Sequence, residues 1–169
     1  MPLSEEIERK FLIRMPDVAR LEKQPEFTCS EIEQIYLSAT QGTTHRIRRR
    51  TKNGKTVCTE TVKRRIDRVS CFEDEKEIDG QTYNELKTKI AEGTSPIVKR
   101  RITFRIGSQL YEVDIYPFWK NTAVLECELP SRDTEVAIPE CLSLLREVTG
   151  DFRFSNAALA SSPVPEDSL

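Results

Sequence analysis

Polar and apolar residues alternate with a period of two over much of the chain. Successive side chains of a strand point to opposite faces of a sheet, so this alternation predicts β-strands. The alternating segments are residues 4–13, 44–51, 56–65, 70–78, 97–106, 109–116 and 123–130. Asn53-Gly54 and Gly107-Ser108 lie between neighbouring segments and are typical of tight turns. The pattern therefore predicts about seven strands, mostly antiparallel.

Helical spacing of apolar residues appears between and after these strands. The segments that show it are residues 15–23, 79–93, 139–150 and 155–161. In the second, Asp79 is placed to cap the helix and Gly93 to end it. In the third, Pro139 falls in the first turn and Gly150 at the end, and in the fourth Ser155 is the expected cap. Short helices among antiparallel strands predict an α+β fold.

The polar positions of the predicted strands carry many charges, whose sign changes from strand to strand. Acids share one face of the first strand and of the last two, at Glu6, Glu8, Glu112, Asp114, Glu126 and Glu128. Bases share one face of three others, at Arg46, Arg48, Lys63, Lys99 and Arg101. An open sheet with its charged face in water is the ordinary interpretation. A closed antiparallel barrel would instead turn the charged face into a lumen, with helices covering the apolar face.

A lumen lined by both acids and bases favours a particular kind of ligand, because buried charges need partners. Carboxylate oxygens suit Mg²⁺ or Mn²⁺, whereas arginine side chains suit phosphate oxygens. The separated charges therefore predict a site for a metal and a polyphosphate. The number of bases, at least six when Lys10 is included, indicates more than one phosphate.

Composition limits the other possibilities. The chain has 169 residues, enough for one domain with a substantial core. Its formal net charge of −2 gives no general reason to bind nucleic acid or an acidic membrane. The basic stretch RIRRRTKNGK suggests a nucleic-acid binder, but such a protein would not need the matched carboxylates. Five cysteines without a CxxC spacing indicate free thiols in a reducing compartment.

Residues 1–160 are expected to form a single domain, and residues 161–169, with two prolines and little to bury, a disordered tail. Residues 2–10 are mostly charged, unlike a signal peptide. Apolar runs stay well short of the ~20 residues that a membrane-spanning helix needs. These features favour a cytoplasmic protein that binds neither membrane nor nucleic acid.

The segment EIERK, at residues 6–10, resembles the ExExK signature of the CYTH superfamily, also called triphosphate tunnel metalloenzymes. Later segments follow in that family's order: RIR at 46–48, TVK at 61–63, EDEKEI at 73–78, VKRR at 98–101, YEVD at 111–114 and ECEL at 126–129. The segment REVTGDFRFSNAALA resembles the closing part of the small bacterial members. The resemblance covers about residues 4–160.

The resemblance implies an eight-stranded antiparallel barrel, open as a tunnel, with a triphosphate and a divalent cation, Mg²⁺ or Mn²⁺, inside. The metal ligands it implies are Glu6, Glu8, Asp114, Glu126 and Glu128. The phosphate ligands are Lys10, Arg46, Arg48, Lys63, Lys99 and Arg101, with Lys87 at the tunnel mouth. The catalytic group comprises Glu6, Glu8, Lys10 and Glu75.

The family includes adenylate cyclases, thiamine triphosphatases and inorganic triphosphatases, so more than one function follows from the resemblance. The leading hypothesis is a metal-dependent triphosphatase that acts on inorganic tripolyphosphate or on a nucleoside or other organic triphosphate. An adenylate cyclase is the first alternative, although the sequence has no evident box for binding adenine. A non-catalytic polyphosphate- or nucleotide-binding protein is the second. The oligomeric state is left open.

Overall fold

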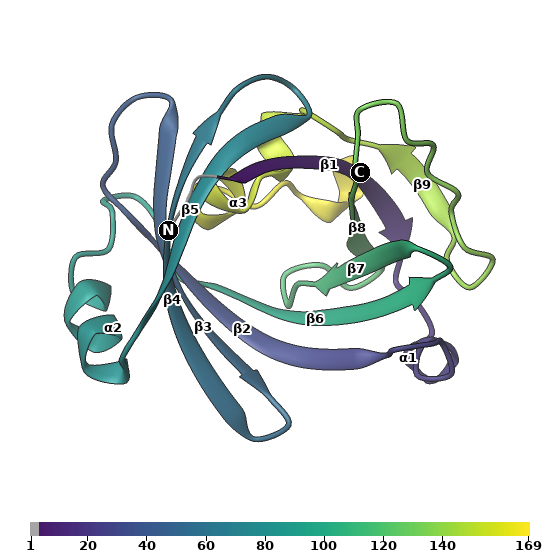
Figure 1. The fold of residues 1–169 in the computed structure, drawn as a ribbon, viewed down its shortest axis with the longest axis horizontal. Helices are drawn as coiled ribbons and strands as arrows, with labels where there is room; N and C mark the ends of the chain where they lie inside the picture. Colours follow the sequence, from purple (N-terminus) through teal and green to yellow (C-terminus); the bar gives the residue numbers. More distant parts are fainter. Residues whose placement is uncertain (1–3) are drawn as a thin grey trace.

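The structure is a computed structural model that describes residues 4–169 (Figure 1). These residues form nine strands: β1 (Ser4–Arg14), β2 (Thr28–Leu37), β3 (Thr43–Lys52), β4 (Lys55–Arg65), β5 (Ser70–Ile78), β6 (Ile97–Ile106), β7 (Gln109–Ile115), β8 (Thr122–Glu128) and β9 (Leu144–Glu147). Their order in the sheet is β5-β4-β3-β2-β6-β7-β8-β1-β9, and β5 also pairs with β1. Eight antiparallel strands therefore close into a barrel, which confirms the expected fold, and β9 is an extra strand beside β1.

The strand that the sequence pattern missed is β2. Ile32 and Tyr36 share one face of this strand with Gln34, whereas Glu33 shares the other face with Ile35. Each face mixes polar and apolar residues, so the period of two is hidden in the sequence. The strand is nevertheless needed to close the barrel, since it pairs with β3 on one side and β6 on the other.

Two predicted hairpins are present. Asn53 and Gly54 join β3 to β4 with φ angles of 51° and 75°, the left-handed conformation that a two-residue turn between twisted strands requires. Gly107, with φ of 60°, joins β6 to β7. Both turns fix the register of their strands, and this register decides which charged residues lie side by side.

Residues 4–169 contain few helices: α1 (Val18–Leu21), α2 (Gly80–Lys87) and α3 (Asn156–Ser161), with 3₁₀ turns η1 (Phe152–Phe154) and η2 (Glu166–Ser168). Two predicted caps are confirmed. Asp79 accepts a hydrogen bond from the backbone N–H of Thr82 at 2.7 Å, and Ser155 accepts one from that of Ala158 at 3.1 Å. The helix that begins after Asp79 ends at Lys87, earlier than the expected stop at Gly93.

The helix expected over residues 139–150 is wrong, because this segment contains the strand β9. Beyond Ile7, one edge of β1 is no longer paired with β5, and an unpaired edge favours addition of another strand. β9 takes that place, with Glu147 opposite Phe11. Of the apparent helical stripe, Leu142 and Val148 are buried in different clusters, whereas Leu145 is 41% exposed, so the stripe does not pack as one face.

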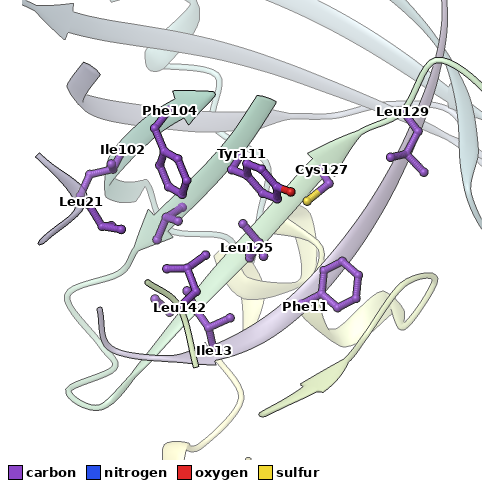
Figure 2. Close-up of a cluster of buried hydrophobic side chains, with 12 residues drawn as sticks. Phe11, Ile13, Leu21, Ile102, Phe104, Tyr111, Leu125, Cys127, Leu129 and Leu142 are labelled. Carbon is purple, nitrogen blue, oxygen red and sulfur yellow. The ribbon is translucent and has the colours of Figure 1, made fainter. Parts of the chain in front are cut away.

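Apolar side chains cover the outside of the barrel in two places. One cluster lies on the outer face of β1, β6, β7 and β8, where Phe11, Phe104 and Leu125 pack with Leu142 from the loop before β9 (Figure 2). The other lies under α2, beside β3 and β4, and is centred on Tyr83 (Figure 1). The outer face is thus the apolar face, and the charged face points inward as expected for a barrel.

A third apolar cluster fills one end of the barrel. Leu12 and Val124 lie on the lumen face of their strands, and they pack against Phe154 of η1 and Leu159 of α3. Because these apolar side chains occupy the space between the strands, the segment from η1 to α3 closes this end. The charged part of the lumen lies between this closed end and the opposite mouth.

The final segment, for which we expected a disordered tail, lies against the closed end in the structure. The indole N–H of Trp119 donates to the carbonyl oxygen of Val164 at 2.8 Å. The carboxylate of Glu166 accepts from the backbone N–H groups of Lys120 and Asn121 at 3.0 and 2.5 Å. Within residues 4–169, none of the helices has the length and apolar character needed to span a membrane.

Candidate active site

Alternate residues of the barrel strands point into the lumen, where their contacts run from strand to strand. Lys63 on β4 reaches Glu6 on β1, with 2.5 Å between Nζ and Oε2, and Glu73 on β5, with 3.4 Å between Nζ and Oε2. Arg46 on β3 reaches the same Glu73, with 3.4 Å between Nη2 and Oε1. Four strands therefore contribute charges to one enclosed space.

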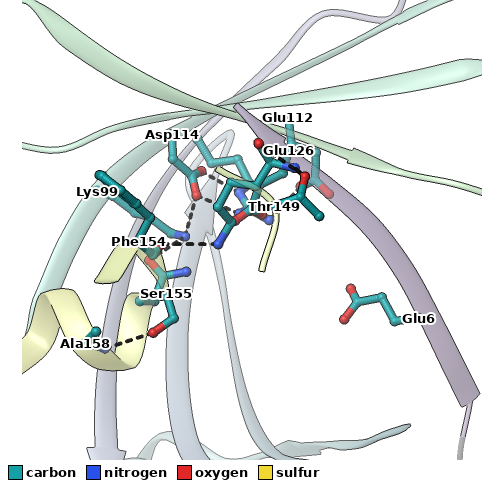
Figure 3. A network of polar contacts seen from close by, with 12 residues as sticks. Glu6, Lys99, Glu112, Asp114, Glu126, Thr149, Phe154, Ser155 and Ala158 are labelled. Carbon is teal, nitrogen blue, oxygen red and sulfur yellow. Dashed lines mark hydrogen bonds and ion pairs between the residues drawn. The ribbon is translucent and has the colours of Figure 1, made fainter. Parts of the chain in front are cut away.

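One wall of the lumen, on β6, β7 and β8, pairs each base with acids, and we call it the paired wall (Lys99, Arg101, Glu112, Asp114 and Glu126; Figure 3). Arg101 binds Asp114 through two parallel hydrogen bonds of 2.6 and 2.7 Å. Its Nη1 donates to Glu112 at 2.6 Å, and Nη2, which also binds Asp114, donates to Glu126 at 2.9 Å. Lys99 Nζ lies 2.6 Å from Asp114 Oδ2, and both of these side chains are fully buried.

Burial and pairing compete in setting the protonation of this wall. Burial alone would raise the pKa of Asp114, but Arg101 and Lys99 outweigh it and hold that pKa below its ordinary value. Burial and the neighbouring Arg101 lower the pKa of Lys99 to about 7, although Asp114 opposes this shift. Asp114 is therefore held in its ionised form, whereas for Lys99 the attraction of Asp114 does not offset burial.

Lys10 links β1 to the segment that closes the barrel. Its Nζ lies 3.1 Å from Glu126 Oε1 and donates to the carbonyl oxygen of Phe154 at 3.2 Å. Asn156, which the sequence did not single out, accepts from Lys99 at 3.4 Å and from the hydroxyl of Tyr116 at 2.6 Å. Two of the expected phosphate ligands are therefore positioned by η1 and α3 as well as by the strands.

The neighbouring wall, on β2 and β3, has bases with few acidic partners, and we call it the basic wall (Gln34, Arg46, Arg48 and Arg50). Arg48 Nε donates to the neutral amide oxygen of Gln34 at 3.1 Å. Arg50 Nε donates to the hydroxyl of Ser30 at 2.9 Å. The buried Nε of Arg46 has no hydrogen-bond partner among residues 4–169.

The lack of acids on the basic wall is reflected in the pKa of Arg48. Burial, together with the positive charges of Arg46 and Arg101, lowers the pKa of Arg48 to about 9, although Glu75 opposes this shift. Burial is the largest cause of this shift, and the nearby positive charges add to it. The basic wall therefore has the charge and the free donors to bind an anion.

A cavity of about 510 Å³ opens at the end of the basic wall, and we call it the basic mouth. Its lining includes Arg48, Arg50, Lys52, Lys55, Thr59 and Glu75. This volume falls in the range of pockets that hold small organic ligands. Glu75, an expected catalytic residue, accepts a hydrogen bond from Thr61 at 2.8 Å. Arg50 and Lys52 were not predicted as site residues, although they continue the period-two series of Arg46 and Arg48.

Carboxylates of β1 and β8 lie next to one another at the acidic side of the lumen. Glu8 is directly opposite Glu128 in the sheet, and Lys10 is opposite Glu126. Burial raises the pKa of Glu8 to about 7, and the charge of Glu126 raises it as well. Burial also raises the pKa of Glu128, with Glu6 adding to the shift. A nearby cation would relieve this repulsion.

Not all of the expected metal ligands suit that cation equally. Both oxygens of Asp114 already hold Arg101 and Lys99, so this carboxylate is a counter-ion for bases. Glu8 and Glu128 suit a hard divalent cation, because each lies near other carboxylates, whose charges add to burial in raising its pKa. Within residues 4–169, His, Cys, Asp and Glu side chains form no group of three that could hold an ion. The metal roles therefore stay predictions.

Lys87 lies outside the barrel, away from the expected phosphate ligands. Its Nζ contacts both carboxylate oxygens of Glu33, at 3.0 and 3.1 Å. Glu33 is on the outer face of β2 and also accepts from the hydroxyl of Tyr83, which packs in the outer apolar cluster. The tunnel-mouth position expected for Lys87 is therefore corrected, because α2 presents this residue to the outer surface.

Comparison with known proteins gives matches among solved structures. No protein-family model matches the chain, and no curated protein matches it. The crystal structure of the inorganic triphosphatase NE1496 is 29% identical, covers 95% of this chain and 96% of that chain, and superposes with a TM-score of 0.59. Nearly the whole of both chains is thus shared, and an identity of 29% supports more than a common fold.

Two further structures support the fold alone. The PH1819 protein from Pyrococcus horikoshii OT3 is 22% identical, with 76% of this chain and 80% of that chain covered and a TM-score of 0.59. A Vibrio parahaemolyticus protein provisionally called an adenylate cyclase is 13% identical, with 75% and 78% covered and a TM-score of 0.51. The barrel is therefore common to proteins with differently named activities.

Proposed function

The chain belongs to the CYTH superfamily, and we propose that it is a divalent-metal-dependent hydrolase of triphosphates that binds its substrate within the barrel lumen. The observation that carries this proposal is the surplus of buried positive charge on the basic wall. Arg46 reaches one acid, Glu73, at 3.4 Å and Arg48 contacts a neutral amide, whereas Arg101 contacts three carboxylates. A chain of phosphates supplies many negative oxygens along a line, which matches bases spaced along neighbouring strands.

The preferred substrate in this proposal is inorganic tripolyphosphate, with nucleoside and other organic triphosphates as poorer substrates. Each base that contacts a phosphate oxygen in this enclosed site adds about 1.5–3 kcal/mol as a charge-assisted hydrogen bond. Residues of the basic mouth are mostly charged, so an adenine there would gain little. The likeness to a protein described as an inorganic triphosphatase supports the same substrate class.

In the proposed reaction, a water oxygen attacks the terminal phosphorus of tripolyphosphate. The bridging P–O bond breaks, its electron pair stays on the pyrophosphate, and orthophosphate and a proton are released. Arg46, Arg48 and Arg101 neutralise the charge that develops on the phosphate oxygens. Asp114 fixes the orientation of Arg101 and Lys99 through the contacts that hold them at 2.6–2.7 Å. Lys10 is held by Glu126 and Phe154 at the closed end.

A divalent cation, Mg²⁺ or Mn²⁺, supplies further neutralisation of phosphate charge when it is bound. The residues that would hold it are the carboxylates of the acidic side, Glu6, Glu8, Glu126 and Glu128. Glu6 is bound to Lys63 and Glu126 to Lys10, so binding of the substrate's phosphates to these two lysines would release carboxylate oxygens for the cation. Phosphate and cation are therefore expected to bind together.

The test is a product analysis by chromatography. Tripolyphosphate, ATP and thiamine triphosphate are each incubated with the full chain, with Mg²⁺, with Mn²⁺ or with a chelator. The expected result is orthophosphate and pyrophosphate from tripolyphosphate, slower release from ATP, and no reaction with chelator. Cyclic AMP from ATP with tripolyphosphate left intact would contradict the proposal and indicate a cyclase. Tight binding of tripolyphosphate without products would indicate a binding protein.

A further inference from the structure

The barrel wall is incomplete between β1 and β5. These strands pair over only four residues of β1, from Ser4 to Ile7, and the same edge of β1 passes to β9 from Phe11 onward. Between them the wall consists of two loops, residues 66–69 and 148–151. Links across this seam include a hydrogen bond from the backbone N–H of Glu8 to Val69 at 3.0 Å. Another runs from the backbone N–H of Lys10 to the hydroxyl of Thr149, also at 3.0 Å.

A cavity of about 190 Å³ opens at this seam, and we call it the seam portal. Its lining includes Glu8, Lys10, Arg65, Arg68, Cys71 and Gly150. Glu8 and Cys71 belong to the lumen, since the thiol of Cys71 contacts the carboxylate of Glu6 at 3.4 Å. Arg65 and Arg68 are exposed. The portal therefore connects the acidic side of the lumen with the surface, and its lining shares no residue with that of the basic mouth.

Among residues 4–169, Arg65 and Arg68 of the portal form no ion pair with the lining acids Glu8, Asp67 and Asp151. Arg65 donates to the carbonyl oxygens of Asp67 and Arg68 at 3.1 and 3.3 Å, and Arg68 Nε donates to that of Thr149 at 2.9 Å. Two acids in the lining have their own partners outside it. Asp67 lies 2.7 Å from Arg132. Asp151 lies 2.7 Å from Arg153, so neither acid cancels the portal's charge.

Gly150 makes the position of Arg68 possible. Its φ is +73°, and a Cβ on this residue would lie 2.0 Å from Cγ of Arg68. The arginine stem thus lies directly against the glycine backbone, in space that any side chain at position 150 would take. The loop is therefore built so that a guanidinium reaches the portal from the surface.

We propose that the seam portal is a binding and exit site for orthophosphate, separate from the basic mouth through which the polyphosphate enters. This inference rests on the proposed function, because the reaction releases orthophosphate inside the lumen, whose residues Glu8 and Lys10 also line the portal. The different volumes of the two cavities support separate sites for entry and exit. The portal has room for about six waters at ~30 Å³ each, which suits a small tetrahedral anion with part of its hydration. It is smaller than the ~300 Å³ at which pockets for organic ligands begin, whereas the basic mouth exceeds that limit.

The experiment measures orthophosphate binding directly, by calorimetric titration of the full chain without metal or substrate. Arg68→Ala and Arg65→Ala are compared with the matched control Arg64→Ala. Arg64 is the exposed neighbour of Arg65 and points to the outer face, where its guanidinium lies 5.4 Å from the centre of the Phe72 ring. The two portal variants are expected to weaken orthophosphate binding about tenfold each, because each loses a charge-assisted contact. Arg64→Ala should bind as the wild type does.

A kinetic readout separates the portal from general loss of structure. Inhibition of tripolyphosphate hydrolysis by added orthophosphate should weaken about tenfold in Arg68→Ala, while the KM for tripolyphosphate stays unchanged. Gly150→Ala should have the same effect by displacing Arg68 without removing its charge. If Gly150→Ala fails to fold, the exposed Arg68→Gln tests the same point.

The outcomes distinguish this proposal from the function on which it rests. Orthophosphate binding that is unchanged in Arg65→Ala and Arg68→Ala, but lost in Arg48→Ala at the basic mouth, would overturn the portal while leaving the hydrolase intact. A wild type that hydrolyses no triphosphate, yet binds orthophosphate only when Arg68 is present, would overturn the hydrolase and support the portal as an anion site.

Discussion

The paired wall and the basic wall are neighbouring parts of the same lumen, joined where β2 pairs with β6, yet their arginines have opposite surroundings. Arg101 contacts three carboxylates, at distances from 2.6 to 2.9 Å. Arg48 contacts only a neutral amide at 3.1 Å, and its pKa falls to about 9. Both guanidiniums are buried in one barrel, so burial alone does not explain the difference. The number of acids within contact distance of each guanidinium explains the difference.

The comparison separates structural from functional charge. A buried ion pair that is complete contributes little net stability, but removing one partner leaves an uncompensated charge that costs several kcal/mol. The paired wall is complete, so its members depend on each other. The basic wall is incomplete in the protein alone, so its bases weaken the fold slightly and gain a partner only when an anion binds. Substitutions on the two walls should therefore have opposite effects on stability and on activity.

The largest effect is expected from Asp114→Ala on the paired wall. This change leaves Lys99 and Arg101 buried without their shared carboxylate, which should lower the free energy of unfolding by about 3–5 kcal/mol. For a chain of this size, the melting temperature should fall by roughly 6–20 °C. Circular dichroism during heating measures this change. Glu31→Ala, which removes an exposed partner of Arg100, is the control and should lower the melting temperature by about 4 °C at most.

Arg48→Ala on the basic wall should show the reverse pattern. Loss of one charge-assisted contact to phosphate lowers kcat/KM for tripolyphosphate about 10- to 100-fold. The free energy of unfolding should stay the same or rise, because repulsion from Arg46 and Arg101 is relieved. Steady-state kinetics and urea denaturation on the same samples measure both quantities. Arg49→Ala is the matched control, since Arg49 points outward to Glu33, and it should keep normal activity. A large loss of stability in Arg48→Ala would remove the distinction between the walls.

Binding of tripolyphosphate should give the bases of the basic wall the negative partners that the bases of the paired wall already have. At about one hundred times its dissociation constant, tripolyphosphate should raise the free energy of unfolding by about 2.7 kcal/mol, which corresponds to roughly 5–11 °C in melting temperature. The measurement is a thermal melt in the presence of a chelator, so that the bases act without a divalent cation. The increase should largely disappear in Arg48→Ala. An equal increase in that variant would show that tripolyphosphate binds elsewhere.

The charged lumen was predictable because it depends on a local rule. Once Arg48, Arg101 and Glu126 are on strands, the period of two puts each on one face, and closure of the barrel makes that face internal. The same rule fails to choose partners. Asp114 was predicted as a metal ligand, but its register opposite Arg101 gives both of its oxygens to bases. Register depends on the turn at Gly107 and on the neighbouring strands, so single positions do not reveal it.

Other differences have equally specific causes. The helix predicted over residues 139–150 rested on apolar spacing. In the structure this segment instead forms the strand β9, which pairs with the free edge of β1. Lys87 was expected near the mouth because its helix follows a tunnel strand. The direction of that helix is set instead by Tyr83 in the outer apolar cluster. In both cases a contact with a distant strand outweighed a local pattern, and nothing in the local sequence marks that contact.

The smallest predicted effect concerns an ion pair outside the barrel, which extends the comparison to a pair in water. Arg9 on β1 and Glu147 on β9 form two hydrogen bonds of 2.8 Å, with 33% and 39% of their side chains exposed. The hydrogen bonds from Arg9 lower the pKa of Glu147 to about 2. Because solvent screens this pair, Glu147→Gln should cost less than about 1 kcal/mol at pH 7, far less than Asp114→Ala.

The pH determines whether the Arg9–Glu147 pair contributes to the free energy of unfolding. A carboxyl whose pKa is lower in the folded state than in the unfolded state stabilises the fold above its unfolded pKa, which is 4.5 for Glu147. That stability is lost as the pH falls from 4.5 toward 2. Urea denaturation of wild type and Glu147→Gln should therefore differ at pH 7 and converge as the pH falls through this window. A difference as large as that of Asp114→Ala, or one that persists at pH 2, would mean that β9 depends on Glu147 for its packing. The exposed pair would then belong with the paired wall rather than with ordinary surface charge.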